Sequence, residues 1–175
     1  GKEGATAPEK GSAHCALLFR SEDLLHYTEL GLLPIAPAEE TLEEPFREVF
    51  SHPVVLNIGK FAHQKGQWHL IRAFSKVKEI IPDARLVILG QGPLAEYLKD
   101  TACQMGLEPD VYFPGYQLNP FKFIARSRIF ILSSLFEGFP NALFEAMACG
   151  VPVISSDCRS GPREILAPGT PPEWE

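Results

Sequence analysis

The stretch that decides the fold is VVLNIGKFAHQKGQWHLIRAFSKVKEIIPDARLVILGQGP (residues 54–93), in which two short apolar runs flank a segment with helical periodicity. The runs VVLNIG (54–59) and ARLVILG (84–90) are largely apolar on both faces, which is typical of strands buried in a parallel sheet. The segment between them, QWHLIRAFSKVKEII (67–81), is long enough for a helix that crosses from one strand to the next. The stretch therefore predicts one β-α-β unit, in which a helix connects two strands.

The same alternation continues to residue 166. Three further strand-like runs lie at 111–115, 128–134 and 151–155, and helix-like segments lie at 94–106, 119–127, 141–150 and 161–166. Parallel strands joined by crossover helices form a doubly wound, Rossmann-like α/β sheet. Ligands of such sheets bind at the carboxyl ends of the strands. The loops at that edge are 59–66, 90–93, 115–119, 134–141 and 155–162.

The net charge of −6 is distributed unevenly along the chain. Residues 1–53 hold 10 acidic and 4 basic side chains, whereas residues 54–175 hold 12 of each. We interpret 1–53 as an acidic, proline-containing extension, a linker or the remnant of another domain, with room for a strand and a helix in 15–33 and a short helix near 43–50. We expect residues 54–175 to form the ligand-binding domain. Because this domain is neutral, it lacks the general field that attracts nucleic acid, and we expect no nucleic-acid partner.

Composition restricts the class of protein and its compartment. With 175 residues, 45% of them hydrophobic and 22% charged, the chain can bury an ordinary core, which excludes disorder throughout. No stretch approaches the roughly eighteen consecutive apolar residues of a membrane span, and the start of the chain has no apolar targeting segment. The four cysteines, Cys15, Cys103, Cys149 and Cys158, fit neither a CxxC metal pair nor a small disulfide-bonded scaffold. We therefore expect a soluble protein in a reducing, cytoplasmic compartment.

Two lysines occupy the loop after the first strand, GKFAHQKG (59–66). Lys60 and Lys65 lie between a strand end and a helix start, where backbone amides without partners already favour an anion. The loop is not a Walker P-loop, because its GK pair is not followed by Ser or Thr. The two lysines suit a diphosphate. A solvated loop with two surface lysines is the alternative.

The second loop, GQGPLA (90–95), contains a loose dinucleotide-binding pattern formed by Gly90, Gly92 and Ala95. Pro93 is a good first-turn residue of a helix, so the glycines also fit a simple tight turn. No acidic residue follows the next strand, where a dinucleotide-binding sheet places one against the ribose. An NAD-dependent Rossmann oxidoreductase is therefore the less favoured alternative.

The fourth loop and its helix, SSLFEGFPNALFEAMACG (133–150), hold two glutamates eight residues apart. Glu137 lies in the loop and Glu145 lies one to two turns into the helix, so they do not share a helical face. Carboxylates accept paired hydrogen bonds from vicinal hydroxyls, so the two residues suit a sugar and a ribose on either side of a diphosphate. The amides expected to be free between them are those of Asn141, Ala142 and Leu143. An incidental loop acid and a surface helix acid are the alternative.

Residues 54–166 resemble the C-terminal, donor-binding half of GT-B glycosyltransferases of the large retaining family 4. GKFAHQKG is similar to the family's GRL..QKG loop, LVILGQGP to its second-strand glycine turn, and VYFPGY to its V.F.G element. EGFPNALFEAMACGVPVISSDCRSGPREIL is similar to its E-x7-E signature and the strand that follows. The last motif is highly specific.

The resemblance implies a role for each matching residue. In the family, the loop cations bind the nucleotide diphosphate, the first glutamate and nearby amides hold the donor sugar, and the second glutamate holds the ribose. These roles carry over to Lys60 and Lys65, to Glu137, Gly138 and Phe139, and to Glu145, respectively. The residues expected to act in catalysis are Glu137, Lys65 and Lys60, and the donor-binding set is Gly59, Lys60, Lys65, Gly90, Gly92, Glu137, Gly138, Phe139, Asn141, Ala142, Leu143 and Glu145. No metal and no separate cofactor is implied, because lysines and helix amides neutralise the diphosphate.

The implied reaction is retaining transfer of a hexosyl unit from a UDP- or GDP-sugar to an acceptor hydroxyl, in the synthesis of a polysaccharide, glycolipid or similar glycan. Lys60 stands where the family usually has Arg, which removes a planar pair of donors to the diphosphate. The family's N-terminal domain binds the acceptor, and we expect it to be absent here apart from at most a remnant in 1–53. The helices that normally follow the fifth unit are also expected to be absent.

The chain is therefore expected to be the donor-binding part of a larger enzyme. A glycan or lipid-linked acceptor would be held by the missing domain, and peripheral contact of the complete protein with the cytoplasmic face of a membrane is left open. Without that domain the acceptor does not reach the reacting geometry, so we expect this chain to bind donor but to transfer no sugar. A non-catalytic nucleotide-binding module is the alternative from another class.

Overall fold

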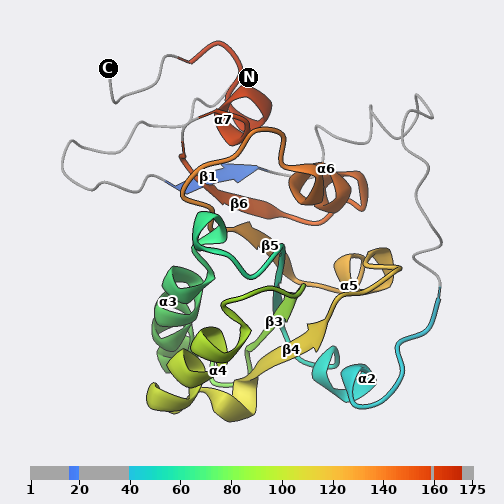
Figure 1. The fold of residues 1–175 in the computed structure, drawn as a ribbon. Helices are drawn as coiled ribbons and strands as arrows, with labels where there is room; N and C mark the ends of the chain where they lie inside the picture. The colour runs from blue at the N-terminus through green and yellow to red at the C-terminus, as the bar shows by residue number, and fades with distance from the viewer. Residues whose placement is uncertain (1–15, 20–39, 159, 171–175) are drawn as a thin grey trace.

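The computed structural model describes residues 16–19, 40–158 and 160–170, and of residues 16–19 only the backbone (Figure 1). Its sheet has the order β1-β6-β5-β2-β3-β4. The strands are β1 (Ala16–Phe19), β2 (Val54–Ile58), β3 (Arg85–Leu89), β4 (Val111–Gly115), β5 (Ile129–Leu132) and β6 (Val153–Ser156). Strands β2 to β6 are mutually parallel, which confirms the doubly wound sheet predicted from the five apolar runs.

The edge strand β1 pairs with β6 in the antiparallel direction. It lies in the part of the acidic N-terminal segment where the sequence left room for a strand. The helix expected after it, within 20–33, lies outside the described residues.

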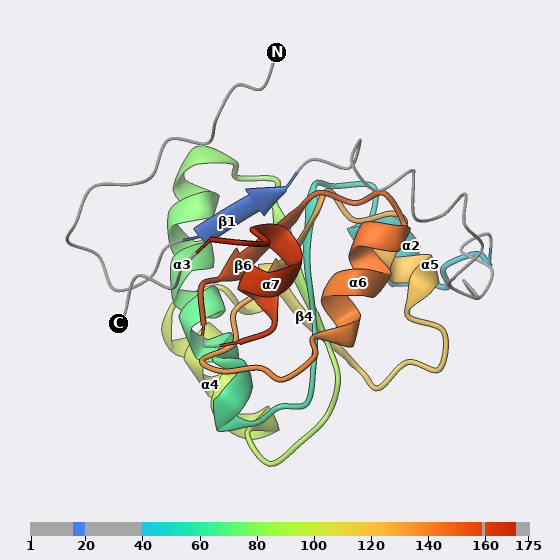
Figure 2. The same cartoon turned by 90° about the horizontal axis from the view of Figure 1, so that it is seen from above.

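Each helix-like segment of the sequence forms a helix. The helices are α2 (Phe46–Val49), α3 (Gln67–Ile80), α4 (Ala95–Gln104), α5 (Phe121–Ile124), α6 (Asn141–Ala148) and α7 (Pro162–Leu166), with 3-10 turns η2 (His63–Lys65) and η3 (Glu108–Asp110). Helices α3 and α4 lie on one side of the sheet, and α2, α5 and α6 lie on the other (Figures 1 and 2). The layers are those of a doubly wound fold.

Two buried clusters fill the two sides of the sheet. Leu56 and Phe130 of the central strands pack with α5 and α6, whereas Val55 and Leu86 pack with α3 and α4. Alternate residues of the same strand thus serve opposite layers, because successive side chains of a strand point to opposite faces. Because both faces of these strands are covered, their sequences are largely apolar throughout.

The described end of the N-terminal segment packs on the α5 layer. Val49 is buried in the core there, and the rings of Phe46 and Phe50 stand edge-on to Phe123, with centroids 5.7 and 5.8 Å apart. Such edge-to-face pairs stabilise a core beyond the area that they bury. Residues 46–50 therefore belong to the same packed unit as the sheet.

The strand order creates a reversal beside β2. From β2 the chain proceeds outward to β3 and β4, and it then returns to β5 on the other side of β2. The loops that leave β2 and β5 consequently diverge over opposite layers of the sheet. In open α/β sheets the crevice between such loops is where ligands bind.

Candidate functional site

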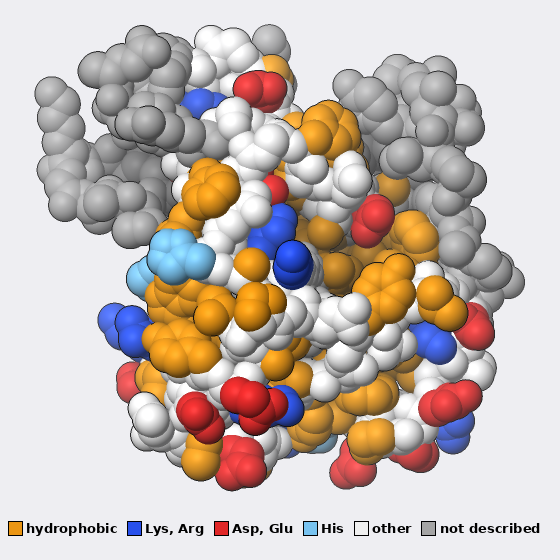
Figure 3. Space-filling model, viewed as in Figure 1, with side chains coloured by type: hydrophobic (Ala, Val, Ile, Leu, Met, Phe, Trp, Pro, Cys, Tyr) orange, Lys and Arg blue, Asp and Glu red, His pale blue; other side chains and the backbone are white. Residues whose placement is uncertain are grey.

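A cavity of about 950 Å³ opens at the carboxyl ends of the parallel strands, beside this reversal. Figure 3 shows the hollow, with basic side chains at its margin and apolar surface within it. Ten of the twelve residues predicted to bind the donor line it: Gly59, Lys60, Lys65, Gly90, Gly92, Glu137, Phe139, Asn141, Ala142 and Glu145. The structure thus brings together residues from three loops and from helix α6 that lie up to 86 positions apart in sequence.

An ion pair crosses the floor of the site from one loop to another. The Nζ atom of Lys65 lies 2.6 Å from Oε1 of Glu137, and the two side chains are 21% and 4% exposed. The hydroxyl of Ser134 donates a second hydrogen bond to the same Oε1, at 2.5 Å. A carboxylate with so little exposure is costly to bury unless it is paired and hydrogen-bonded, and both conditions are met here.

Three further hydrogen bonds fasten the Lys65 turn to the loop that carries Glu137. The amide of Leu135 donates to the carbonyl of Gln64 at 2.8 Å, and the Gln64 side chain donates to the carbonyl of Phe136 at 3.0 Å. The hydroxyl of Ser133 donates to the carbonyl of Lys65 at 2.9 Å. The ion pair therefore lies between two loops that are already joined through their backbones.

Close contact of these loops requires the glycine that ends the turn. Gly66 has a φ of 56°, and a Cβ placed on it would lie 2.4 Å from the carbonyl oxygen of Ser133. Any other residue would both strain the backbone and push the carbonyl of Ser133 away. The QKG sequence is thus explained by packing as well as by its lysine.

Lys60 differs from Lys65 in its surroundings. It lines the cavity but is exposed, and among the described residues its ammonium has no hydrogen-bond or ion-pair partner. One lysine is therefore held in place by a carboxylate, and the other presents an unneutralised charge to the cavity. Two cations so placed suit a ligand with two linked anionic groups.

The glycine pattern of the second loop is accounted for by contact between loops. A Cβ on Gly90 would lie 2.0 Å from the carbonyl oxygen of Gly59, and one on Gly92 would lie 2.5 Å from that of Phe61. The amide of Phe61 also donates to the carbonyl of Gln91 at 2.9 Å. The two glycines let the second loop pack against the first, so the pattern needs no dinucleotide to explain it.

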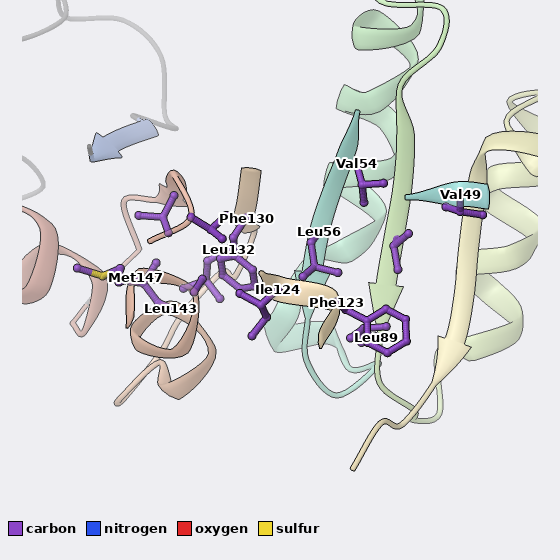
Figure 4. Close-up of a cluster of buried hydrophobic side chains, with 14 of the residues drawn as sticks. Val49, Val54, Leu56, Leu89, Phe123, Ile124, Phe130, Leu132, Leu143 and Met147 are labelled. Atoms are coloured by element: carbon purple, nitrogen blue, oxygen red, sulfur yellow. The ribbon is translucent and has the colours of Figure 1, made fainter. Parts of the chain in front are cut away.

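Glu145 reaches the cavity from α6. Figure 4 shows that Leu143 and Met147 of this helix belong to the buried cluster with Leu132 of β5, which fixes the helix against the sheet. Glu145 is partly buried, and this burial raises the pKa of its carboxyl group above the ordinary value of 4.5. Burial also raises the pKa of the neighbouring Cys149 thiol to about 11, and the charge of Glu145 adds to that effect. As the sequence predicted, the two glutamates come from a loop and from a helix.

The expectation of free amides at the start of α6 was wrong for two of the three residues. The amide of Asn141 donates to the carbonyl of Phe139 at 3.0 Å, and that of Leu143 donates to Pro140 at 2.9 Å. The first turn of the helix thus satisfies its own donors through tight turns, as helix ends often do. The side chain of Leu143 is fully buried, and neither Leu143 nor Gly138 lines the cavity.

Several residues at or beside the cavity carry little signal in the sequence. Tyr116 and Gln117 line the cavity from the loop after β4, which was identified as part of the site edge without a named residue. Asn57 is buried in β2 and donates to the carbonyl of Ile131 in β5 at 2.8 Å, which ties the two strands together at the reversal. The only signal for Asn57 was a polar residue inside an apolar run.

The loop between β6 and α7 is hydrogen-bonded to the loop that carries Glu137. The hydroxyl of Ser160 donates to the carbonyl oxygen of Glu137. Arg163 of α7 forms a bidentate ion pair with Asp157 in the same loop. The cavity therefore rests on a framework that also involves the last parallel strand.

The described residues provide neither a group of metal ligands nor a membrane-spanning helix. Across 40–158 and the flanking described stretches, no three His, Cys, Asp or Glu side chains are grouped so that they could hold a metal ion. Within the same residues no helix is long and apolar enough to cross a membrane.

Residues 39–171 match the family model described as glycosyl transferases group 1. The chain belongs to this family. This glycosyltransferase chain is 48% identical over 132 residues to an uncharacterized glycosyltransferase of Methanocaldococcus jannaschii, covering 75% of the chain and 32% of that protein. It is 34% identical over 152 residues to the N-acetylgalactosamine-N,N'-diacetylbacillosaminyl-diphospho-undecaprenol 4-alpha-N-acetylgalactosaminyltransferase of Campylobacter jejuni, covering 87% of the chain and 37% of that enzyme.

Solved structures agree with the family assignment. The lipopolysaccharide outer core galactosyltransferase WaaB superposes with a TM-score of 0.59 at 31% identity, over 70% of this glycosyltransferase chain and 37% of WaaB. Anabaena HepE in complex with UDP superposes with a TM-score of 0.56 at 25% identity, over 62% of this chain and 30% of HepE. The glycosyltransferase chain spans about a third of the length of the curated relatives that it matches. The sheet is the Rossmann-like α/β architecture of GT-B glycosyltransferases.

Proposed function

We propose that this chain binds a nucleotide diphosphate sugar in the 950 Å³ cavity and supports retaining transfer of a hexosyl unit to an acceptor hydroxyl. The diphosphate lies against Lys60 and Lys65, the sugar against Glu137, and the ribose against Glu145. The observation that carries the proposal is that two cations and two carboxylates line one cavity, with Lys65 paired to Glu137. A nucleotide sugar offers complementary groups, because its sugar and its ribose carry hydroxyls and the diphosphate between them carries negative charge.

The positive charges of Lys60 and Lys65 suit cleavage of the bond between the sugar and the diphosphate. When the bond between the anomeric carbon and the phosphate oxygen breaks, negative charge develops on the nucleotide diphosphate. Lys65 is fixed by Glu137 and Lys60 faces the cavity, so both can stabilise that charge without a large rearrangement. With this neutralisation the transfer requires no metal ion and no separate cofactor.

The donor we propose is a UDP- or GDP-sugar. UDP is the nucleotide named in the solved complex of HepE, which supports a nucleoside diphosphate as the common part of the ligand. The acceptor is a glycan or lipid-linked sugar, in line with the undecaprenol-linked substrate in the name of the Campylobacter relative. Synthesis of such a glycan would take place in the cytoplasm or at the cytoplasmic face of a membrane.

Because the matched segment makes up only 32% and 37% of these two relatives, the acceptor is proposed to bind outside these 175 residues. The chain alone then binds donor without transferring sugar, since an acceptor that is not positioned loses the advantage of proximity. Sugar transfer by the purified chain to undecaprenol-linked or oligosaccharide acceptors would contradict this part of the proposal.

Binding itself is tested by thermal shift against UDP-glucose, UDP-galactose, UDP-N-acetylglucosamine, GDP-mannose and ADP-glucose, each beside its bare nucleotide. The expected result is stabilisation by at least one nucleotide sugar, because a ligand that binds only the folded state raises the melting temperature. Lys60→Ala serves as the matched variant, since it removes a cavity cation that has no partner among the described residues. No shift with any nucleotide sugar for the unaltered chain would refute donor binding.

A further inference from the structure

Ser134 lies three residues before Glu137, in the same loop. It follows β5 by two residues and is 1% exposed. Its hydroxyl donates to Oε1 of Glu137 at 2.5 Å, and its own carbonyl accepts a hydrogen bond from the hydroxyl of Ser156 at the end of β6. The donor to Glu137 therefore follows closely on β5 and is tied by a hydrogen bond to the end of β6.

Two donors converge on one oxygen of the Glu137 carboxylate. Lys65 and Ser134 both reach Oε1, and in the described part of the chain no hydrogen bond reaches Oε2. An ionised carboxylate has about four acceptor positions on its two oxygens, so Oε2 keeps its capacity to accept hydrogen bonds. Glu137 also lines the cavity, so this capacity is available to a ligand there.

The two donors differ in how firmly they can hold the carboxylate. Lys65 is a flexible side chain whose ammonium has three donors and, under the proposed function, a diphosphate as a second anionic partner. Its hold on Glu137 is therefore shared with the ligand. Ser134 is buried and has no such competitor, so its hydroxyl bond persists while Lys65 serves the diphosphate.

We infer that Ser134 is a positioning residue that sets sugar recognition, by holding Oε1 of Glu137 so that Oε2 accepts from a hydroxyl of the donor sugar. The inference rests on the proposed function and adds to it a residue that does not touch the ligand. A carboxylate that is already oriented loses less conformational freedom when the sugar binds, so the affinity for the sugar part of the ligand is higher. The bare nucleotide diphosphate has no group at Glu137, so its affinity does not depend on how Ser134 orients that side chain.

Calorimetry measures two dissociation constants, one for the bare nucleotide and one for its nucleotide sugar. The readout is the first constant divided by the second. The probe is whichever of UDP-glucose, UDP-galactose, UDP-N-acetylglucosamine and GDP-mannose binds the unaltered chain most tightly, with UDP or GDP as its partner. Ser134→Ala is expected to lower this ratio about tenfold while leaving the affinity for the bare nucleotide nearly unchanged. Ser155→Ala is the matched control, because Ser155 is also fully buried and its hydroxyl donates to a backbone carbonyl rather than to Glu137.

A double variant distinguishes positioning from a general effect of the buried hydroxyl. Because Ser134 acts through Glu137, adding Ser134→Ala to Glu137→Gln should change the ratio no further. An unchanged ratio in Ser134→Ala, or an equal loss in Ser155→Ala, would overturn the inference while donor binding stands. If the unaltered chain bound none of the four nucleotide sugars, the proposed function would fail first and the inference with it.

Discussion

The Nζ atom of Lys65 lies 2.6 Å from Oε1 of Glu137, so a residue that follows β2 and a residue that follows β5 form one ion pair across the reversal of the sheet. The pair joins the two functions that the sequence assigned separately, diphosphate binding and sugar binding. Because the Glu137 side chain is 4% exposed, loss of Lys65 would leave a nearly buried carboxylate without its cation. The two residues should therefore be tested together as well as singly.

Lys65→Ala should lower the free energy of unfolding by about 3 kcal/mol, near the lower end of the usual cost of leaving a buried charge without its partner. The lower end applies because the Lys65 side chain is partly exposed to water. Lys65→Ala combined with Glu137→Gln should recover part of this loss, since no unpaired carboxylate remains. Urea unfolding at pH 7 of the two single variants and the double variant measures the coupling. Strictly additive losses would show that the two side chains do not depend on each other.

Lys60→Ala should weaken binding of the nucleotide diphosphate without destabilising the fold. A charge-assisted contact is worth about 1.5–3 kcal/mol, which corresponds to roughly a ten- to hundredfold loss of affinity. Stability should change by no more than about 0.5 kcal/mol, because Lys60 is exposed and has no ion-pair partner among the described residues. Lys60→Arg should retain or improve the affinity, since a guanidinium contacts a phosphate through two donors. Equal affinities for all three chains in calorimetry would remove Lys60 from the site.

The two glutamates should differ in which ligand they affect. Glu137→Gln removes the charge that strengthens hydrogen bonds to the sugar, so it should weaken binding of the nucleotide sugar and leave the bare nucleotide nearly unaffected. Glu145→Gln should weaken both ligands about equally, because both carry the ribose. Calorimetric titration of both variants with both ligands checks this. Equal losses for the two ligands in Glu137→Gln would contradict its assignment to the sugar.

Donor affinity should fall as the pH is lowered through the pKa of Glu145. Burial raises this pKa, so the carboxyl group gains a proton at a higher pH than an ordinary glutamate does. The protonated group accepts hydrogen bonds from ribose hydroxyls less strongly, so the ligand binds the ionised form better. A nucleotide sugar is the appropriate ligand, because a bare diphosphate titrates in the same direction. Glu145→Gln should flatten the affinity profile in acid, and an unchanged profile would exclude Glu145 from ligand binding.

Most of the fold was predictable because its strands are short and apolar throughout. The runs at 54–59 and 84–90 leave no polar face for solvent, and only a sheet covered on both sides accommodates that. The pairing of β1 with β6 was not predictable, since a four-residue edge strand carries too little pattern to specify a partner.

The residue types of the site were predictable, but their contacts were not. Lys65 and Glu137 were assigned to different parts of a ligand, and their direct pairing depends on how closely two loops approach, which Gly66 permits. Ser134 was invisible in the sequence because a serine after a strand is common in loops and turns. The amides of Asn141 and Leu143 were expected to be free, but tight turns at the start of α6 engage them.

The most direct test of the proposed site is a titration of the ¹⁵N-labelled chain with the nucleotide sugar that gives the largest thermal shift, followed through its backbone amide resonances. Binding in the cavity should move the amides of 59–66 and 137–145, because the diphosphate and the sugar contact those two loops. The amides of α3 beyond its first turn should move little. Saturable changes confined to residues outside the cavity, or no changes at all, would contradict donor binding at this site.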